Sequence, residues 1–254
     1  MQSRTAPGSP SGPPVRPAAT SDVLGDDLGE LLGARIPADH SRQTLADSYA
    51  RPAARVLDLG CGAGGSVDLF RSLAPAVKWV GADIAGSPEV AERTRTDAEF
   101  VTFDGELLPF DDASFGLVFC KQVLEHVRRP EPLVGEVARV LEPGGLLVGS
   151  TSQLEAFHSR STFNLTPYGL LLLVEAAGLE LVEVRPGIDG LTLVAWRALG
   201  MPRFFGRWWA RESPLNRVIE AAGALARLDA RTRNQVKLTL CGQFCFLAAR
   251  PRAG

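Results

Sequence analysis

Short apolar segments rich in β-branched and aromatic residues recur along the chain, and longer segments with helical periodicity separate them. Each short segment is bounded by glycine, proline or polar residues. We expect six strands, at residues 55–59, 78–83, 99–103, 115–120, 145–151 and 179–185. Strands that alternate with helices indicate a mostly parallel sheet with right-handed crossovers, and therefore an open, doubly wound α/β fold.

The segment "PLVGEVARVLEPGG" is a clear example of the helical pattern. Its apolar residues fall on one face of a helix: Leu133, Val137, Val140 and Leu141. We expect Gly144 and Gly145 to end this helix. A last apolar run, residues 236–250, is predicted to be one more strand or a hairpin. Between it and the sixth strand lies an insert at about 200–235, which we expect to be helical from Ser213.

The N-terminal residues carry neither pattern strongly. Residues 1–21 are rich in proline, serine and glycine and have no apolar region of a secretory signal, so we expect a disordered tail. Residues 22–50 are polar and weakly helical. The main domain is therefore predicted to span residues 51–254.

Composition narrows the class of protein. The chain has 254 residues, 45% hydrophobic and 22% charged, with a formal charge of -2, which suits one domain with a full core. Near-neutral charge argues against nucleic acid as the main partner. No apolar run approaches the roughly 18 residues of a membrane span. The cysteines follow no disulfide or metal-ligand spacing, so we expect a cytoplasmic protein without a metal: Cys61, Cys120, Cys241 and Cys245.

A glycine-rich turn directly follows the first predicted strand. Gly60, Gly62 and Gly64 separate that strand from a predicted helix. In a doubly wound sheet, ligands bind at the carboxyl ends of the strands, where this turn would lie. A tight turn without a ligand is the alternative interpretation, and the position of the turn favours a ligand.

Two ligand classes fit the turn. Gly60, Gly62 and Gly65 satisfy a dinucleotide pattern, and Asp83 follows at about the distance expected of a ribose-binding acid. Asp58 argues against a dinucleotide, because a carboxylate would face the pyrophosphate with like charge. The ammonium of an amino acid tail suits Asp58 better. The residues therefore favour S-adenosylmethionine, and a nicotinamide oxidoreductase is the competing prediction.

Four motifs, in order along the chain, resemble those of class I S-adenosylmethionine-dependent methyltransferases. They are "VLDLGCGAGG", "WVGADIAGS", "FDGELLPFDDASFGLVFCKQVLEHV" and "EVARVLEPGGLLVGST". The resemblance is to the methyltransferase-domain group similar to the ubiquinone and menaquinone methyltransferases, and it runs from about Arg55 to Val194. It implies a Rossmann-like fold with a seven-stranded sheet and an N-terminal segment, residues 22–50, that serves as a lid.

The resemblance implies a set of cofactor-binding residues. Asp83 is expected to accept the ribose hydroxyls, with Ile84 against the adenine. Asp104 is expected to accept the adenine amino group, although in isolation it would be interpreted as a turn cap. The full implied set is Asp58, Gly60, Cys61, Gly62, Gly64, Asp83, Ile84, Asp104, Gly105, Glu106, Lys121 and Gln122.

The sequence departs from the family pattern at two places. Gly116 replaces the acid usual in S-F-D, and "GADIAGSPEV" lacks the usual D-x-S. We expect changes in local packing and loop shape, and no loss of the cofactor.

Histidines supply the candidate catalytic bases. His158 follows the fifth predicted strand, where an acceptor would arrive, and a neutral imidazole there could take a proton. His126, in "LEHV", is the second candidate, with a structural role as its alternative. His40 belongs to the predicted lid. We favour O-methylation of a sugar or natural-product hydroxyl. N- or C-methylation, a lipid-linked acceptor, and a non-catalytic cofactor-binding partner subunit stay open.

The insert begins with "PRFFGRWWAR", which places four aromatic residues among three arginines. One interpretation is a surface that contacts a membrane or receives a lipid-linked acceptor. The interpretation that we favour at this point is a helical flap whose aromatic residues pack on the core while its arginines reach outward.

Overall fold

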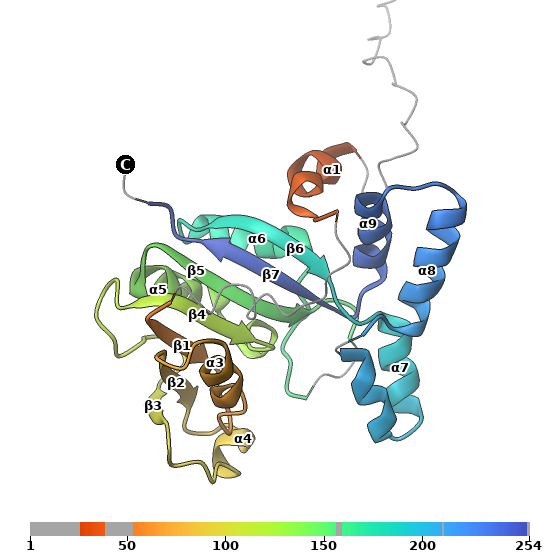
Figure 1. Cartoon of the computed structure of the whole chain (residues 1–254). Coiled ribbons are helices and arrows are strands. Elements are labelled where there is room, and N and C mark those ends of the chain that lie inside the picture. Colours follow the sequence, from red (N-terminus) through yellow and green to blue (C-terminus); the bar gives the residue numbers. More distant parts are fainter. Residues whose placement is uncertain (1–25, 39–52, 156–158, 210, 253–254) are drawn as a thin grey trace, which may run out of the picture.

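The structure, a computed structural model, describes residues 26–38, 53–155, 159–209 and 211–252. Within these residues seven strands form one sheet in the order β3-β2-β1-β4-β5-β7-β6 (Figure 1). The strands are β1 (Arg55–Leu59), β2 (Lys78–Ile84), β3 (Glu99–Phe103), β4 (Phe115–Lys121), β5 (Leu141–Ser152), β6 (Glu180–Pro186) and β7 (Gln243–Ala249). All six strands predicted from the pattern are present.

The sheet is mostly parallel. β1 pairs in parallel with β2 and β4, β2 with β3, and β4 with β5. β7 pairs antiparallel with both β5 and β6 and lies between them. The predicted open, doubly wound, seven-stranded sheet is confirmed.

Helices cover both faces of the sheet. The helical segments are α1 (Asp26–Leu32), η1 (Gly33–Arg35), α3 (Val67–Leu73), α4 (Pro88–Ala91), η2 (Leu124–His126), α5 (Pro130–Val140), α6 (Pro167–Ala176), α7 (Gly190–Ala198), η3 (Arg203–Trp209), α8 (Pro214–Leu225) and α9 (Ala230–Leu240). Val67 and Phe70 of α3 pack in one core cluster, and α5 and α6 contribute to a second, larger one. Apolar residues alternate between these clusters along the strands, as a doubly covered sheet requires.

The predicted end of the helix at Gly144 and Gly145 is wrong. α5 ends at Val140, and β5 begins at Leu141. The physical reason is Pro143, which has no N–H and whose ring would clash with a helical carbonyl four residues earlier. The two glycines lie instead in an irregular part of β5, where Gly144 has a φ of 81° and donates its N–H to the Arg250 carbonyl at 2.9 Å.

The prediction for residues 236–250 is half wrong. Residues up to Leu240 belong to α9, and only 243–249 form a strand. "VKLTL" alternates like a strand, but Asp229 caps the helix by accepting from the Thr232 N–H at 2.7 Å. Lys237 is buried in ion pairs with Glu212 and Glu220. These tertiary contacts outweigh the local strand preference.

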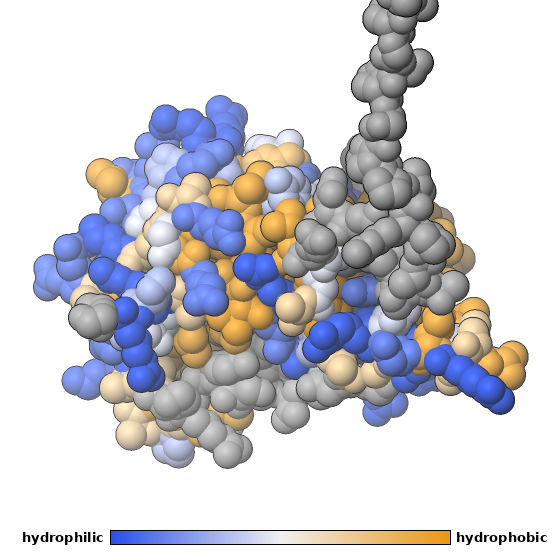
Figure 2. Space-filling view, turned by 90° about the horizontal axis from the view of Figure 1, so that it is seen from above, coloured by the Kyte–Doolittle hydropathy of each residue, from blue (hydrophilic) through white to orange (hydrophobic). Residues whose placement is uncertain are grey.

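The predicted insert is helical, and it is longer than expected. Between β6 and β7 lie α7, η3, α8 and α9, and α8 begins right after Ser213 as predicted. Of the four aromatic residues in "PRFFGRWWAR", only Phe205 is buried, so the predicted packing on the core holds for Phe205 alone. This end of the molecule, at the right in Figure 2, has hydrophobic residues on its surface beside hydrophilic ones.

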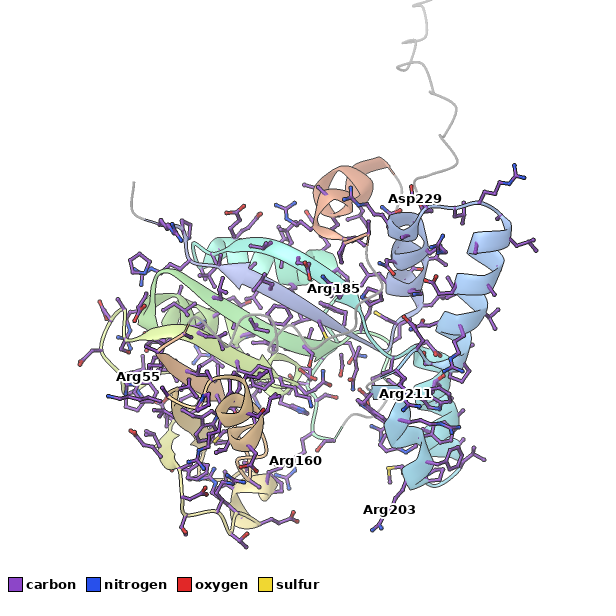
Figure 3. All side chains as sticks on the ribbon, in the orientation of Figure 1. Arg55, Arg160, Arg185, Arg203, Arg211 and Asp229 are labelled. Atoms are coloured by element: carbon purple, nitrogen blue, oxygen red, sulfur yellow. The ribbon has the colours of Figure 1, made fainter. Side chains whose placement is uncertain are left out.

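The insert lies at the carboxyl edge of the sheet. Arg55, at the start of β1, marks the amino edge at the left of Figure 3, and the parallel strands run from there toward the insert. The described part of the N-terminal segment packs against β6 and α9: Arg35 donates to the Leu181 carbonyl at 2.8 Å, and Asn234 donates to the Pro37 carbonyl at 2.8 Å. The rest of the predicted tail and lid lies outside the described residues, so the lid stays a prediction.

Candidate functional site

The glycine turn between β1 and α3 has a backbone that few other residues could adopt. Gly60, Gly62 and Gly64 have φ values of 69°, 50° and 80°, in the left-handed region that glycine enters without steric cost. A Cβ added to Gly60 would also stand 2.4 Å from Cγ2 of Val123. The turn therefore packs directly against the segment that follows β4.

Side chains from two other segments hold the turn in place. Asp83, at the end of β2, accepts the Gly62 N–H through Oδ2 at 2.7 Å and the Ile84 N–H through Oδ1 at 2.7 Å. Arg93 donates Nε to the Gly62 carbonyl at 2.9 Å and lies 4.0 Å from the centre of the Phe100 ring. Both backbone polar groups of Gly62 are thus fixed, and the Asp83 carboxylate is oriented.

Asp58 lies beneath the turn and is only 4% exposed. Burial raises the pKa of its carboxyl to about 7, and the charge of Asp83 adds to this, while a hydrogen bond from Ser66 and the charge of Lys121 lower it. Ser66 in turn accepts the Trp79 Nε1–H at 2.9 Å. A buried carboxylate with a raised pKa is stabilised by a nearby cation. An ammonium group is the kind of partner that suits it.

An apolar surface adjoins Asp83. Ile84 is 43% exposed at the end of β2, and a Cβ on Gly105 would stand 3.5 Å from its Cγ2. Gly105 itself has a φ of 93°. Ile84, predicted to lie against the adenine, and Gly105, another predicted cofactor residue, are therefore neighbours beside the carboxylate predicted to bind the ribose.

Asp104 and Glu106 have local partners. Oδ1 of Asp104 accepts the N–H groups of Glu106 and Leu107, both at 2.8 Å, and these two bonds lower the pKa of its carboxyl. This is the turn-capping geometry of the alternative interpretation, and among the described residues Oδ2 accepts no hydrogen bond. The Glu106 side chain pairs with Arg129 at the surface.

The remaining predicted cofactor residues line the same edge. Cys61 is buried beside Asp58, and burial raises the pKa of its thiol to about 12, which keeps it protonated. Lys121 is exposed at the end of β4. Gln122 follows with a φ of 56° and donates its N–H to the Ser150 carbonyl at 2.8 Å. The structure thus brings the ends of β1, β2 and β4 together around the turn.

Sequence reasoning missed a buried polar cluster at the ends of β5 and β7. Ser152 Oγ lies 3.1 Å from Oε1 of Glu125 and 3.1 Å from Oε2 of Glu155. Thr151 donates to Glu125 at 3.1 Å, and Gln243 donates to Glu155 at 2.6 Å. One hydroxyl proton can serve only one carboxylate at a time, so Ser152 couples the two acids.

The cluster connects the sheet to the insert. Arg197 of α7 donates to Oε1 of Glu155 at 3.0 Å, and Glu155 is almost fully buried. "LEHV" drew attention to His126, while Glu125 beside it is the residue that is fully buried. No signal in the sequence pointed to Glu155, Gln243 or Arg197, because their contacts join segments far apart along the chain.

The candidate catalytic histidines have different outcomes. His126 is half-buried at the end of η2. Val123, the residue before η2, packs against the glycine turn. His158 and His40 lie outside the described residues. The structure therefore does not test His126 or His158 as a base, and both assignments stay predictions.

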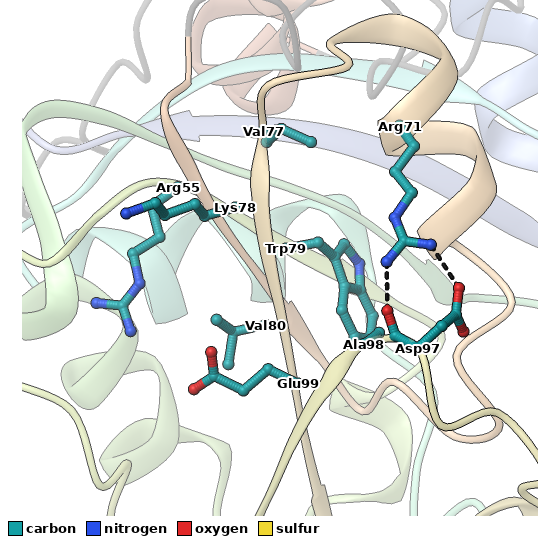
Figure 4. Close-up of a pocket in the computed structure, with 9 residues that line it drawn as sticks. All are labelled: Arg55, Arg71, Val77, Lys78, Trp79, Val80, Asp97, Ala98 and Glu99. Carbon is teal, nitrogen blue, oxygen red and sulfur yellow. Dashed lines mark hydrogen bonds and ion pairs between the residues drawn. The ribbon is translucent and has the colours of Figure 1, made fainter.

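A separate hollow of about 520 Å³ lies at the opposite edge of the sheet (Figure 4). It is lined by the amino ends of β1, β2 and β3, including Arg55, Lys78 and Glu99. Ligands of doubly wound sheets bind at the carboxyl edge. This hollow therefore has the wrong position for the predicted cofactor site.

The carboxyl-edge arrangement fits a nucleoside that carries an amino acid. Asp83 offers oriented carboxylate oxygens, Ile84 offers an apolar surface beside them, and Asp58 offers a carboxylate that favours a cation. A pyrophosphate would meet two buried carboxylates, which like charge disfavours. S-adenosylmethionine has the ribose, the adenine and the ammonium that these groups would hold.

Comparisons with known proteins agree with this fit. Residues 57–149 match a family described as a methyltransferase domain. A demethylmenaquinone methyltransferase of Renibacterium salmoninarum is 37% identical over 109 residues, 42% of this chain and 45% of that protein. A ubiquinone biosynthesis O-methyltransferase of Burkholderia thailandensis is 27% identical over 170 residues, 57% of this chain and 72% of that protein.

Solved structures share the fold. An S-adenosylmethionine-dependent methyltransferase from Mesorhizobium loti has a TM-score of 0.52 at 17% identity, over 84% of this chain and 100% of that chain. This chain spans half or less of the length of the first curated relatives that it matches. The matched domain, the motifs and the fold make this chain similar to the S-adenosylmethionine-dependent methyltransferases, and they support S-adenosylmethionine as its cofactor.

Proposed function

We propose that this protein transfers a methyl group from S-adenosylmethionine to a small-molecule acceptor. The observation that carries the proposal is the edge formed by the glycine turn, Asp58, Asp83 and Ile84. When bound, the cofactor supplies an electrophilic methyl group on its sulfonium. The chain's task is then to hold the donor and acceptor in line, and orientation of this kind can supply roughly 7–11 kcal/mol.

The residues of the edge divide this task. Asp83 would accept the ribose hydroxyls while its backbone bonds to Gly62 and Ile84 keep it from rotating. Asp58 would hold the ammonium, because burial makes its anion depend on a cation. Ile84 would exclude water from the adenine face. Asp104 would use Oδ2 for the adenine amino group, since Oδ1 holds the turn.

The acceptor that we propose is a hydroxyl group on an aromatic ring. One matched relative is named a ubiquinone biosynthesis O-methyltransferase, and this name supports a phenol or quinol over the sugar hydroxyl, which the sequence predicts as one favoured acceptor. His126 and His158 are the candidate bases. A base in position would add roughly 10²–10⁴-fold to the rate of an O-methylation.

C-methylation is the second candidate. Other relatives are named for demethylmenaquinone methylation and for ubiquinone/menaquinone C-methylation. A ring carbon needs less help from a base when a neighbouring hydroxyl is ionised. The two candidates therefore differ in the product and in their dependence on histidine.

Calorimetric titration tests the cofactor assignment. We expect S-adenosylhomocysteine to bind and nicotinamide dinucleotide to give no heat. Asp83→Asn should weaken the first titration, while Asp68→Asn, an exposed acid on α3, should leave it unchanged. Binding of the dinucleotide alone would contradict the proposal.

A labelled-methyl assay tests the reaction. Catechols, hydroquinones, sugars and amines are offered in parallel, and the product is located by mass spectrometry. We expect label on an aromatic hydroxyl, with His126→Gln or His158→Gln lowering turnover and altering its pH profile. Label on a ring carbon would select the second candidate, and cofactor binding with no transfer to any class would favour a non-catalytic partner subunit.

A further inference from the structure

The outer face of α7 is apolar where a surface helix is usually polar. The residues that it exposes follow one helical stripe at the spacing i, i+3, i+4, i+7. They are Leu191, Val194, Ala195 and Ala198. The opposite side of the helix, with Thr192 and Leu193, is buried against the rest of the molecule. α7 therefore buries one side and presents an aliphatic stripe on the other.

α8 repeats this arrangement. It exposes a second aliphatic stripe with the same spacing, while Asn216 and Gly223 are buried on its inner side. The exposed residues are Val218, Ala221, Ala222 and Leu225. Leu225 is 87% exposed. The two helices thus expose aliphatic side chains to water, and this exposure is unfavourable in free energy.

Along the chain, aromatic and basic residues lie between α7 and α8. In η3, Phe204 is 57% exposed and Trp209 is 38% exposed. Arg207 is exposed and its guanidinium lies 4.4 Å from the centre of the Trp208 ring. Arg203 is exposed and points away from the body of the molecule (Figure 3). We call the two stripes and η3 together the insert surface.

Charge on this segment has one sign. Residues 190–211 contain four arginines and no aspartate or glutamate. Arg197 pairs with Glu155, while Arg203 and Arg207 are exposed. Aromatic rings, aliphatic side chains and arginines on one surface suit the boundary of an anionic bilayer, where rings and aliphatic groups leave water and arginines meet lipid phosphates. Of the described residues, no helix is long and apolar enough to cross a membrane, so the contact would be with the surface.

We propose that the insert surface docks on a bilayer that contains anionic lipids. A second copy of the chain suits it less well, because two insert surfaces would oppose their arginines. The N-terminal segment, residues 1–25, suits it less well because it has few large apolar residues. The proposal does not depend on methyl transfer. The insert lies at the carboxyl edge of the sheet, so docking would turn the candidate site toward the membrane.

Vesicle co-sedimentation of the full chain tests the proposal. One vesicle preparation is phosphatidylcholine alone, and the other mixes it in equal parts with phosphatidylglycerol. We expect strong binding to the second preparation only. The double variant Arg203→Gln with Arg207→Gln should bind about twenty-fivefold more weakly, from about fivefold for each basic charge removed. The matched control is Lys78→Gln at the opposite edge, which should bind normally.

The apolar stripes need their own variants. Leu191→Ser with Val194→Ser should weaken binding by about a hundredfold, since each aliphatic side chain that leaves water is worth at least about tenfold. Leu172→Ser, an exposed leucine of α6, is the control. Calorimetry with S-adenosylhomocysteine checks that each variant keeps its fold and its candidate site. A loss of vesicle binding can then be told apart from a failure of the proposed function.

Three results would overturn the proposal. The first is recovery of the unmodified chain in the supernatant with both vesicle preparations. The second is binding that the insert variants leave unchanged. The third is concentration-dependent dimerisation in gel filtration that Leu191→Ser with Val194→Ser abolishes, because the stripes would then be an interface between copies of this chain.

Discussion

The two halves of the sheet position their functional groups by different means. On the side of β3, β2, β1 and β4, backbone conformation does most of the work: three glycines with positive φ shape the turn, and Asp83 holds it through main-chain N–H groups. On the side of β5, β7 and β6, side chains from distant segments meet in a polar cluster around Ser152 and Glu155.

This difference has an energetic consequence. A turn fixed by backbone sterics fails when a single Cβ is added, and it fails together with the ligand site. A cluster of side chains loses one hydrogen bond at a time. Substitutions in the first half should therefore impair both the fold and cofactor binding. Substitutions in the second half should lower stability and leave cofactor binding unchanged.

The largest effect is expected at Gly60. Gly60→Ala introduces both a strained φ and a Cβ 2.4 Å from Val123, which together should lower the free energy of unfolding by about 3 kcal/mol. Urea denaturation measures this. Gly65 is the matched control: nothing lies within 4 Å of its added Cβ, so Gly65→Ala should change stability by less than about 0.5 kcal/mol. Equal losses for the two variants would contradict the backbone account.

Asp83 is expected to have the next largest effect. Asp83→Ala removes both bonds to the backbone and the carboxylate proposed to hold the ribose. We expect affinity for S-adenosylhomocysteine to fall about a hundredfold, because hydrogen bonds to charged groups contribute about 1.5–3 kcal/mol each. Calorimetry measures the affinity. If the folded variant keeps normal affinity, Asp83 does not bind the cofactor. The claim that the first half of the sheet links its turn to cofactor binding would then be wrong.

Arg197 tests the second half. Arg197→Ala removes a charge-assisted hydrogen bond to the buried Glu155, which should lower the free energy of unfolding by about 2 kcal/mol. Affinity for S-adenosylhomocysteine should stay within about twofold of the unmodified protein. Arg203→Ala, an exposed arginine of the same insert, should cost less than about 0.5 kcal/mol. A large loss of cofactor affinity in Arg197→Ala would show that the two halves are coupled.

Asp58 gives a graded effect that is small at each step of pH. Its pKa is raised from 3.8 to about 7, so between these values the folded chain keeps a proton that the unfolded chain has lost. The free energy of unfolding should therefore fall as pH rises, by about 1.4 kcal/mol per unit at most. Affinity for the ammonium-bearing ligand should rise over the upper part of that range, up to about tenfold per unit. Asp58→Asn should flatten both dependences, as paired urea and calorimetric titrations from acid to neutral pH would show.

The contrast also explains what could be predicted from the sequence. The strands and the glycine turn follow from local patterns, because periodicity and left-handed φ requirements leave a trace in neighbouring residues. Asp83 was singled out by its distance from the glycine turn, and Ile84 by the resemblance to the methyltransferase motifs. The predicted end of α5 was wrong because the helix stops before Pro143, and the two glycines lie after that proline. The helix at 236–240 was missed because buried contacts of Lys237 override an alternating pattern.

The polar cluster was beyond a reading of one sequence. Glu155 receives hydrogen bonds from Ser152, Arg197 and Gln243, three residues whose separation along the chain carries no periodic signal. The two aliphatic stripes were visible in principle, since their spacing is regular. Which side of α7 and α8 faces outward is decided by packing, and so it needed the structure.

The place of β7 affects how the molecule can be made. β6 joins the sheet only through β7, which is synthesised later, after α7, α8 and α9. On a translating ribosome, β1 to β5 can assemble while β6 waits without a partner strand, with one edge open to other chains. The half with the candidate cofactor site can therefore mature first, and the half with the polar cluster depends on the last strand to arrive.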